Sequence, residues 1–206
     1  MAIATTGTEH DQDIHNLDPA IVALLPRQGE WSEHDYLWLT EHSNRLVEWT
    51  DGVIEVLPMP TEEHQDVVAY LYGMLHALMQ RIGGKIYFAP LRMRVRPRKF
   101  REPDLLLVRQ KDDPRRSNRY WEGADLVVEV VSPDNPSRDY ETKRADYAGA
   151  GVLEYWIVDP QDETITVLRL HESAYDEHGV FGRGAAATSA LFPEFEVGVD
   201  AVLDAA

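Results

Sequence analysis

Two acidic residues stand in positions where a folded chain would bury them. Glu129 interrupts the apolar run 125–131, and Asp104 opens a second strand-like run, 104–108. Burying a carboxylate is costly unless it is paired, protonated or bound to a metal. If the two strands belong to one sheet, both carboxylates can meet at a common edge. There they could hold a divalent cation through their oxygen atoms.

A lysine follows on the next predicted helix, residues 137–148. Asp139 lies four residues before Lys143 and Tyr147 lies four after it, so the three side chains share one helical face. A bound cation activates water and shields charge, and an ammonium group stabilises a pentavalent transition state. The combination suits hydrolysis of a phosphodiester. We therefore expect Asp104, Glu129 and Lys143 to converge within a few ångström at a sheet edge.

Each of these residues also has a simpler structural interpretation. Asp104 could cap a turn, and Glu129 could pair with an arginine of a neighbouring strand. Asp139 and Lys143 could form a solvent-exposed pair of little energetic weight. His64, on the apolar stripe of a predicted helix, could be an ordinary core histidine. Its place in the first helical turn would also let it reach a site at the sheet edge.

Basic residues are concentrated in one segment of an acidic chain. Residues 81–119 hold 13 Lys and Arg against four acidic residues, a local net of about +9, while the whole chain carries −16. Arginines alternate with other residues in 91–98, so one strand face would present Arg92, Arg94, Arg96 and Arg98. We expect this face to bind nucleic-acid phosphates, whereas the acidic remainder would repel them. Alternatively, the protein's own carboxylates neutralise these arginines.

The hydrophobic pattern predicts a mixed α/β fold with one central sheet flanked by helices. Helices are expected from Ser32 to about residue 41, from Thr61 to Gly83, and over 137–148. Residues 171–190 are expected to form a loop. Strands are expected over 45–49, 53–57, 85–89, 91–98, 104–108, 125–131, 154–158, 164–170 and 195–199. Residues 1–30 are expected to be a loosely ordered lead-in to a single domain, 31–206.

The composition excludes several classes of protein. The chain has no cysteine, which excludes disulfides, thiolate metal sites and a cysteine nucleophile. It has no apolar run long enough to cross a membrane and no secretory signal pattern. We expect a cytoplasmic protein with no membrane partner.

Several blocks of the chain, in order, resemble the Uma-type restriction endonuclease family of the PD-(D/E)XK nuclease superfamily. The resemblance covers about residues 32–205. The matching blocks are 45–52, His64, Pro103-Asp104, 126–133, Asp139…Lys143…Tyr147, 154–160 and 191–195.

The resemblance implies a restriction-endonuclease-like fold and a Mg²⁺-dependent nuclease, with Mn²⁺ as a substitute. Asp104 and Glu129 match the two metal-binding carboxylates. The superfamily's usual lysine position, two residues after the second carboxylate, holds Val131 here. The Uma-type pattern instead implies a lysine from the next helix, which would be Lys143.

The resemblance also implies supporting roles near the site for four residues: Glu48, His64, Asp139 and Tyr147. It suggests a homodimer, since double-strand cleavage needs two active sites. The leading hypothesis is thus an endonuclease that hydrolyses DNA. The alternatives are a nucleic-acid-binding or regulatory module that keeps the fold without cleaving, and a scaffold in which these residues form an internal ion network.

Overall fold

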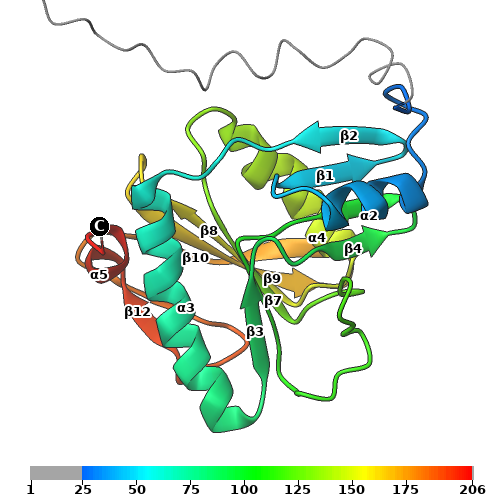
Figure 1. Ribbon diagram of the computed structural model, residues 1–206. Helices are drawn as coiled ribbons and strands as arrows, with labels where there is room; N and C mark the ends of the chain where they lie inside the picture. The colour runs from blue at the N-terminus through cyan, green and yellow to red at the C-terminus, as the bar shows by residue number, and fades with distance from the viewer. Residues whose placement is uncertain (1–24, 206) are drawn as a thin grey trace, which may run out of the picture.

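The computed structural model describes residues 25–205, which build two main sheets and a short one (Figure 1). The six-stranded sheet has the order β10-β9-β8-β7-β6-β3, and only β7 and β8 within it are parallel. Its strands are β3 (Lys85–Phe88), β6 (Leu105–Val108), β7 (Leu126–Val130), β8 (Glu154–Asp159), β9 (Thr164–His171) and β10 (Ala174–Gly182).

A separate four-stranded sheet has the order β2-β1-β5-β4. It contains β1 (Val47–Thr50), β2 (Val53–Val56), β4 (Met93–Arg96) and β5 (Lys99–Arg101). Helix α2 (Glu33–Glu41) lies beside it (Figure 1), and Tyr36 and Leu37 pack on Trp49 and Phe100 in a small core. The short sheet pairs β11 (Ala186–Thr188) with β12 (Glu196–Gly198).

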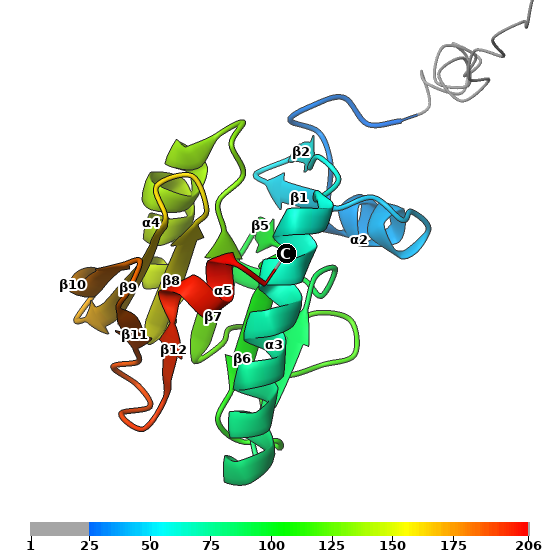
Figure 2. The ribbon, with the colours of Figure 1, turned by 90° about the vertical axis from the view of Figure 1, so that its left-hand side faces the viewer.

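Different elements cover the two faces of the six-stranded sheet. Helices α3 (Glu62–Ile82) and α5 (Val199–Leu203) share one apolar core with alternate residues of β6 to β9. Figures 1 and 2 both show α5 beside α3. The opposite face packs on β4 and on α4 (Arg144–Gly149), which continues the π-helical turn η3 (Arg138–Lys143). The connection through η3 and α4 is the crossover that parallel strands require.

Helix α3 follows its predicted boundaries. The Thr61 hydroxyl accepts a hydrogen bond from the His64 N–H at 3.2 Å, and Gly83 ends the helix with φ +81°. At the C-terminal end of the helix Met79 is buried, while Ile82 is 38% exposed. Because Thr61 caps α3, His64 lies in the first turn, at the end of the helix nearest Asp104.

The predicted mixed central sheet flanked by helices is present, but the hairpin β1–β2 lies outside it and pairs with β5 in the four-stranded sheet. The expected loop 171–190 contains β10 and β11 instead. β10 is an edge strand whose side chains are mostly solvent-exposed, with a bulge between Glu177 and Gly179, so it lacks the apolar alternation of a strand. β5 and α5, of three and five residues, carry too little periodicity to be predicted.

The expected arginine strand is shorter than predicted. Residues 97–98 form the turn between β4 and β5, where Arg98 has φ +64°. Of the expected lead-in, residues 1–24 lie outside the described part. Its last residues contact the hairpin, since Gln28 exchanges two 2.9 Å hydrogen bonds with the backbone of Ile54. Among residues 25–205 there is no helix whose length and hydropathy would let it span a bilayer.

Candidate active site

The register of β6 and β7 places the two carboxylates face to face. Leu105 pairs with Val128, and continuing this antiparallel register by one residue sets Asp104 opposite Glu129. The Asp104 N–H lies 3.4 Å from Glu129 Oε2, and the Val130 N–H donates to Asp104 Oδ2 at 2.8 Å. The structure thus brings Asp104 and Glu129 together at the end of two neighbouring strands, as the sequence predicts.

Local sequence explains why the strands end here. Pro103 has no N–H to extend β6, so the ladder to β7 ends beside it. The buried Val130 N–H then needs another acceptor, and the Asp104 carboxylate supplies it. Both acidic side chains point to the face that η3 and α4 cover, because Asp104 alternates in phase with Leu106 and Glu129 with Val127.

Side chains of η3 and α4 contact Glu129 on this face of the sheet. Lys143 Nζ lies 2.9 Å from Glu129 Oε2 and 3.0 Å from Asp139 Oδ1, while the Tyr147 hydroxyl donates to Glu129 Oε1. The Lys143 side chain is only 8% exposed, so the interpretation of a solvated surface pair is wrong. Pairing of Glu129 with a strand arginine is likewise not observed among the described residues. The three helical side chains share one face, as predicted.

Burial and charge act against each other at this cluster. Burial raises the pKa of Glu129 to about 8, and the charges of Asp104 and Asp139 add to the rise that Lys143 opposes. Burial alone would lower the pKa of Lys143, but Glu129, Asp139, Glu48 and Asp104 outweigh it and raise that pKa. Lys143 is therefore a permanent cation among several carboxylates. Glu129 and Asp139 share this one ammonium, and burial raises the pKa of both carboxyl groups.

His64 reaches the same point from the other side of the sheet. Its Nε2 lies 3.2 Å from Asp104 Oδ2, and its buried Nδ1 has no hydrogen-bond partner among the described residues. Burial lowers the pKa of His64, but the hydrogen bond to Asp104 and the nearby charges raise it more. His64 is thus more than a core histidine, because it contacts one of the two opposed carboxylates.

Glu48 lies beside this cluster rather than in it. Its buried carboxylate is 3.0 Å from Arg101 Nη1 and 2.5 Å from Arg138 Nη2, and it accepts from the Glu102 N–H at 3.3 Å. The Nη2 atom of Arg101 lies 2.8 Å from Asp146 Oδ2. Sequence reasoning missed both arginines. Arg138 directly precedes Asp139 on the predicted lysine-bearing helix, which was the one available signal for it.

The donor set is compatible with a hard divalent cation. Asp104 and Glu129 offer only carboxylate oxygens, the ligands that Mg²⁺ prefers. Within residues 25–205, no group of three or more His, Asp or Glu side chains is arranged to hold a metal by itself. Proteins usually hold Mg²⁺ with one or two carboxylates, and water and substrate phosphates complete its coordination. Two opposed carboxylates match that usual number of protein ligands.

The four predicted nucleic-acid-binding arginines lie in different surroundings. Arg92 is mostly buried and donates to the Thr40 carbonyl at 2.9 Å, with Glu102 at 3.6 Å from its Nε. Arg94 on β4 contacts Glu33 and Glu122.

Arg96 and Arg98 both contact Asp51, at 2.7 and 3.5 Å. All four arginines therefore meet carboxylates of the same chain, which is the alternative that the sequence left open. Of the four, Arg96 and Arg98 have the most exposed side chains, at 45% and 60%. Phosphate binding by this set stays a prediction.

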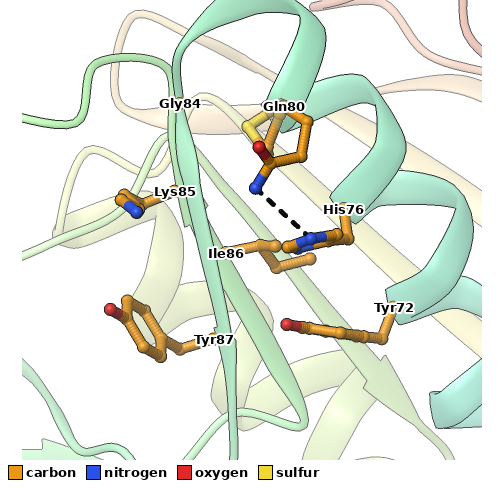
Figure 3. Close-up of a pocket in the computed structure, with 8 residues that line it drawn as sticks. Tyr72, His76, Gln80, Gly84, Lys85, Ile86 and Tyr87 are labelled. Atoms are coloured by element: carbon orange, nitrogen blue, oxygen red, sulfur yellow. Dashed lines mark hydrogen bonds between the residues drawn. The ribbon is translucent and has the colours of Figure 1, made fainter.

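A small pocket of about 120 Å³ lies elsewhere, between α3 and β3 (Figure 3). His76 and Gln80 share a 3.3 Å hydrogen bond in it, and Tyr72 and Tyr87 lie below them in the view of Figure 3. The pocket is lined by Tyr72, His76, Met79, Gln80, Gly84, Lys85, Ile86 and Tyr87. It contains no carboxylate and none of the predicted site residues, so it is separate from the acidic cluster.

The fold defines a restriction-endonuclease-like protein, as predicted. The crystal structure of "a putative nuclease belonging to DUF820" from Anabaena variabilis is similar, with a TM-score of 0.66 and 18% identity, covering 82% of this chain and 97% of that chain. A family model described as "Uma2: Putative restriction endonuclease" matches residues 32–203. The chain belongs to this Uma2 family, which confirms the resemblance. A search of curated proteins found no match.

Proposed function

We propose that the protein is a Mg²⁺-dependent endonuclease that hydrolyses DNA phosphodiester bonds, with Mn²⁺ able to replace Mg²⁺. The observation that carries the proposal is the convergence of Asp104, Glu129 and Lys143 at the ends of β6 and β7. Family membership and the nuclease-like fold support it.

Each residue of the cluster has a part that its contacts suggest. Asp104 and Glu129 would hold the cation. When bound, Mg²⁺ shields phosphate charge and lowers the pKa of a coordinated water. Lys143, which stays protonated, would stabilise negative charge that develops on the phosphate oxygens.

The remaining cluster residues would hold these groups in position. Tyr147 fixes one Glu129 oxygen, and Asp139 holds the Lys143 ammonium. His64 orients the Asp104 carboxylate through its Nε2. Glu48 acts further out, through the arginines that it contacts.

A second candidate is a nucleic-acid-binding or regulatory module that does not cleave. It is favoured by the fact that protein donors already contact both Glu129 oxygens, Tyr147 on one and Lys143 on the other. In that case the cluster would be an internal ion network that stabilises the crossover.

Incubating the protein with supercoiled plasmid DNA in Mg²⁺, Mn²⁺ or EDTA distinguishes the nuclease from the non-cleaving module. We expect nicking or linearisation by the wild type with either metal, and a reduction of at least about 100-fold in rate for Asp104→Asn. Asp112→Asn, the same change at an exposed acid of the 109–125 connection, is the matched control and should cleave normally. Calorimetric titration with Mn²⁺ should show binding that Asp104→Asn weakens. Metal binding or DNA binding without any cleavage would favour the module.

A homodimer and a cytoplasmic location remain predictions from the sequence. We propose the dimer because two active sites would let the protein cut both strands of a duplex at one place. One chain supplies a single cluster of this kind among its described residues.

A further inference from the structure

We propose that Arg138 is the phosphate-binding side chain of this site, and that Glu55 covers its outer edge until a substrate phosphate replaces it. The inference rests on the proposed function, because its ligand is the phosphodiester that the site would hydrolyse. It adds a substrate-binding residue and a resident competitor to that function.

The two ends of the Arg138 guanidinium have different partners. Its Nη2 lies 2.5 Å from Glu48 Oε2, a fully buried carboxylate. Its Nη1 lies 2.5 Å from Glu55 Oε1, on the edge strand β2, and the Glu55 side chain is 58% exposed. The inner half of the guanidinium is thus held inside the protein, while the outer half is held by a carboxylate in contact with solvent.

Arg138 stands next to the reactive cluster. It directly precedes Asp139 in η3, and the Asp139 carboxylate lies 3.0 Å from Lys143 Nζ. The guanidinium and the ammonium therefore come from one helical turn. A phosphate near Lys143 would have a second cation within reach on the side of β2.

The neighbouring cations are less available for a ligand. Arg101, the other arginine on Glu48, is buried with Nη1 on Glu48 and Nη2 on Asp146 at 2.8 Å. Lys143 is enclosed by two buried carboxylates. Of the two arginines that contact Glu48, only Arg138 pairs with an exposed acid.

Exchange of the Glu55 carboxylate for a phosphate is favourable on general grounds. The Glu55 side of this pair is 58% exposed and the Arg138 side 16%, so releasing Glu55 changes an equilibrium by at least the roughly 1.4- to 5-fold of a fully exposed pair. The freed Nη1 can donate a charge-assisted hydrogen bond to a phosphate oxygen, and such bonds are stronger than ordinary ones, while Nη2 stays on Glu48. The negative charge of Glu55 also repels approaching anions. It would therefore weaken the binding of a phosphate that has no hydrogen-bond donor besides Arg138.

The test compares three variants in the binding of a fluorescein-labelled, mixed-sequence DNA duplex, by fluorescence anisotropy with EDTA present to prevent cleavage. Glu55→Gln removes the competing charge and should tighten binding by about 1.4- to 5-fold. Arg138→Lys keeps the charge but not the forked geometry, and should weaken binding by about 3- to 10-fold.

Glu194→Gln is the matched control. Glu194 is 55% exposed and pairs with Arg81 at 3.6 Å, at the far end of α3, about 25 Å along the helix axis from His64. It removes the same charge from an arginine–glutamate pair that is exposed on both sides, so it reports how net charge alone affects DNA binding. The expected result is a larger gain in affinity for Glu55→Gln than for Glu194→Gln.

Equal gains for Glu55→Gln and Glu194→Gln would overturn the inference, as would wild-type affinity in a folded Arg138→Lys variant or no duplex binding by any variant. If Arg138→Lys fails to fold, the comparison of Glu55→Gln with Glu194→Gln decides alone. A plasmid assay with Mg²⁺ separates the two proposals. If the variants change DNA affinity as expected but the wild type never cleaves plasmid, the phosphate site is supported and the nuclease is refuted. If the wild type cleaves but the variants do not change affinity as expected, only the phosphate site is refuted.

Discussion

Glu48 is a buried carboxylate between two guanidinium groups, on the strand that pairs with the Glu55 strand in the hairpin. Burial alone would raise the pKa of Glu48, but the charges of Arg101, Lys143 and Arg138 outweigh burial and hold that pKa below its ordinary value of 4.5. Removing one member of a buried ion pair leaves the other charges uncompensated. Glu48 should therefore matter for stability as well as for the position of Arg138.

We expect Glu48→Gln to lower the free energy of unfolding by about 3 kcal/mol near neutral pH. Because the folded pKa lies below the unfolded one, the stabilisation by Glu48 is complete above pH 4.5 and disappears as the pH falls toward the folded value. Urea denaturation at several pH values should show the difference from wild type shrinking in acid. Glu177→Gln, at an exposed acid of β10, should change stability by less than about 0.5 kcal/mol. A difference that stays constant down to strongly acidic pH would contradict this.

At the scale of elements, the hairpin β1–β2 carries both Glu48 and Glu55, and its turn is closely packed. Asp51 and Gly52 have positive φ angles of +50° and +95°. The Gly52 carbonyl accepts from the N–H groups of Gly29 and Trp31 at 2.8 and 3.1 Å. A Cβ atom at position 52 would lie 2.3 Å from the Gly29 carbonyl oxygen. The turn therefore requires glycine for two separate reasons.

Gly52→Ala should destabilise the protein by about 1–3 kcal/mol, because the backbone must leave the left-handed region or displace the segment that precedes α2. The control is Gly73→Ala in the middle of α3, where an added Cβ meets nothing within 4 Å. That change should raise stability by about 0.5–1 kcal/mol through helix propensity. Thermal unfolding of both variants checks the pair, and a neutral or stabilising Gly52→Ala would show that the turn tolerates another geometry.

The sequence predicts those parts of the site that depend on short-range patterns. Glu129 is identifiable because it breaks an apolar run, and Lys143 and Tyr147 because helical spacing puts them on one face. The π-helical turn is not predictable from the same spacing, since residues four apart contact each other in α-helices as well.

Long-range pairing could not be predicted. Arg138 and Glu48 are 90 residues apart in the chain and meet only because the four-stranded sheet packs against the crossover. The same holds for Arg101 and Asp146, which are 45 residues apart. For the arginines of 91–98 the period-two pattern placed Arg94 and Arg96 on a common face. It carried no information on Glu33 and Asp51, the carboxylates that meet them.

At the scale of the whole molecule, charge is distributed unevenly. The chain carries −16, yet its basic segment 81–119 has a local net of about +9. Ion pairs inside the chain neutralise much of this segment, as at Arg94 and Arg115. Because exposed pairs are weak, Arg96 and Arg98 can still exchange Asp51 for a phosphate.

We therefore expect the double variant Arg96→Ala/Arg98→Ala to bind DNA more weakly. Each phosphate that is no longer neutralised should reduce the slope of log affinity against log salt by about 0.9, so the slope should fall by up to about two units. Arg169→Ala, at an exposed arginine of β9 outside the segment, controls for the change in net charge. If the melting temperature drops while DNA affinity and its salt dependence are unchanged, these arginines serve the structure alone.

The connection 109–125 between β6 and β7 has a consequence for how the site can be divided. Most of its residues are exposed, and the opposed carboxylates lie on either side of it. A single break there would leave Asp104 and His64 on one fragment, and Glu129 and Lys143 on the other. We expect neither fragment alone to have the proposed nuclease activity, because each lacks one of the two opposed carboxylates. A chain cut in this connection should regain the proposed activity only where the two fragments associate and re-form the β6–β7 ladder.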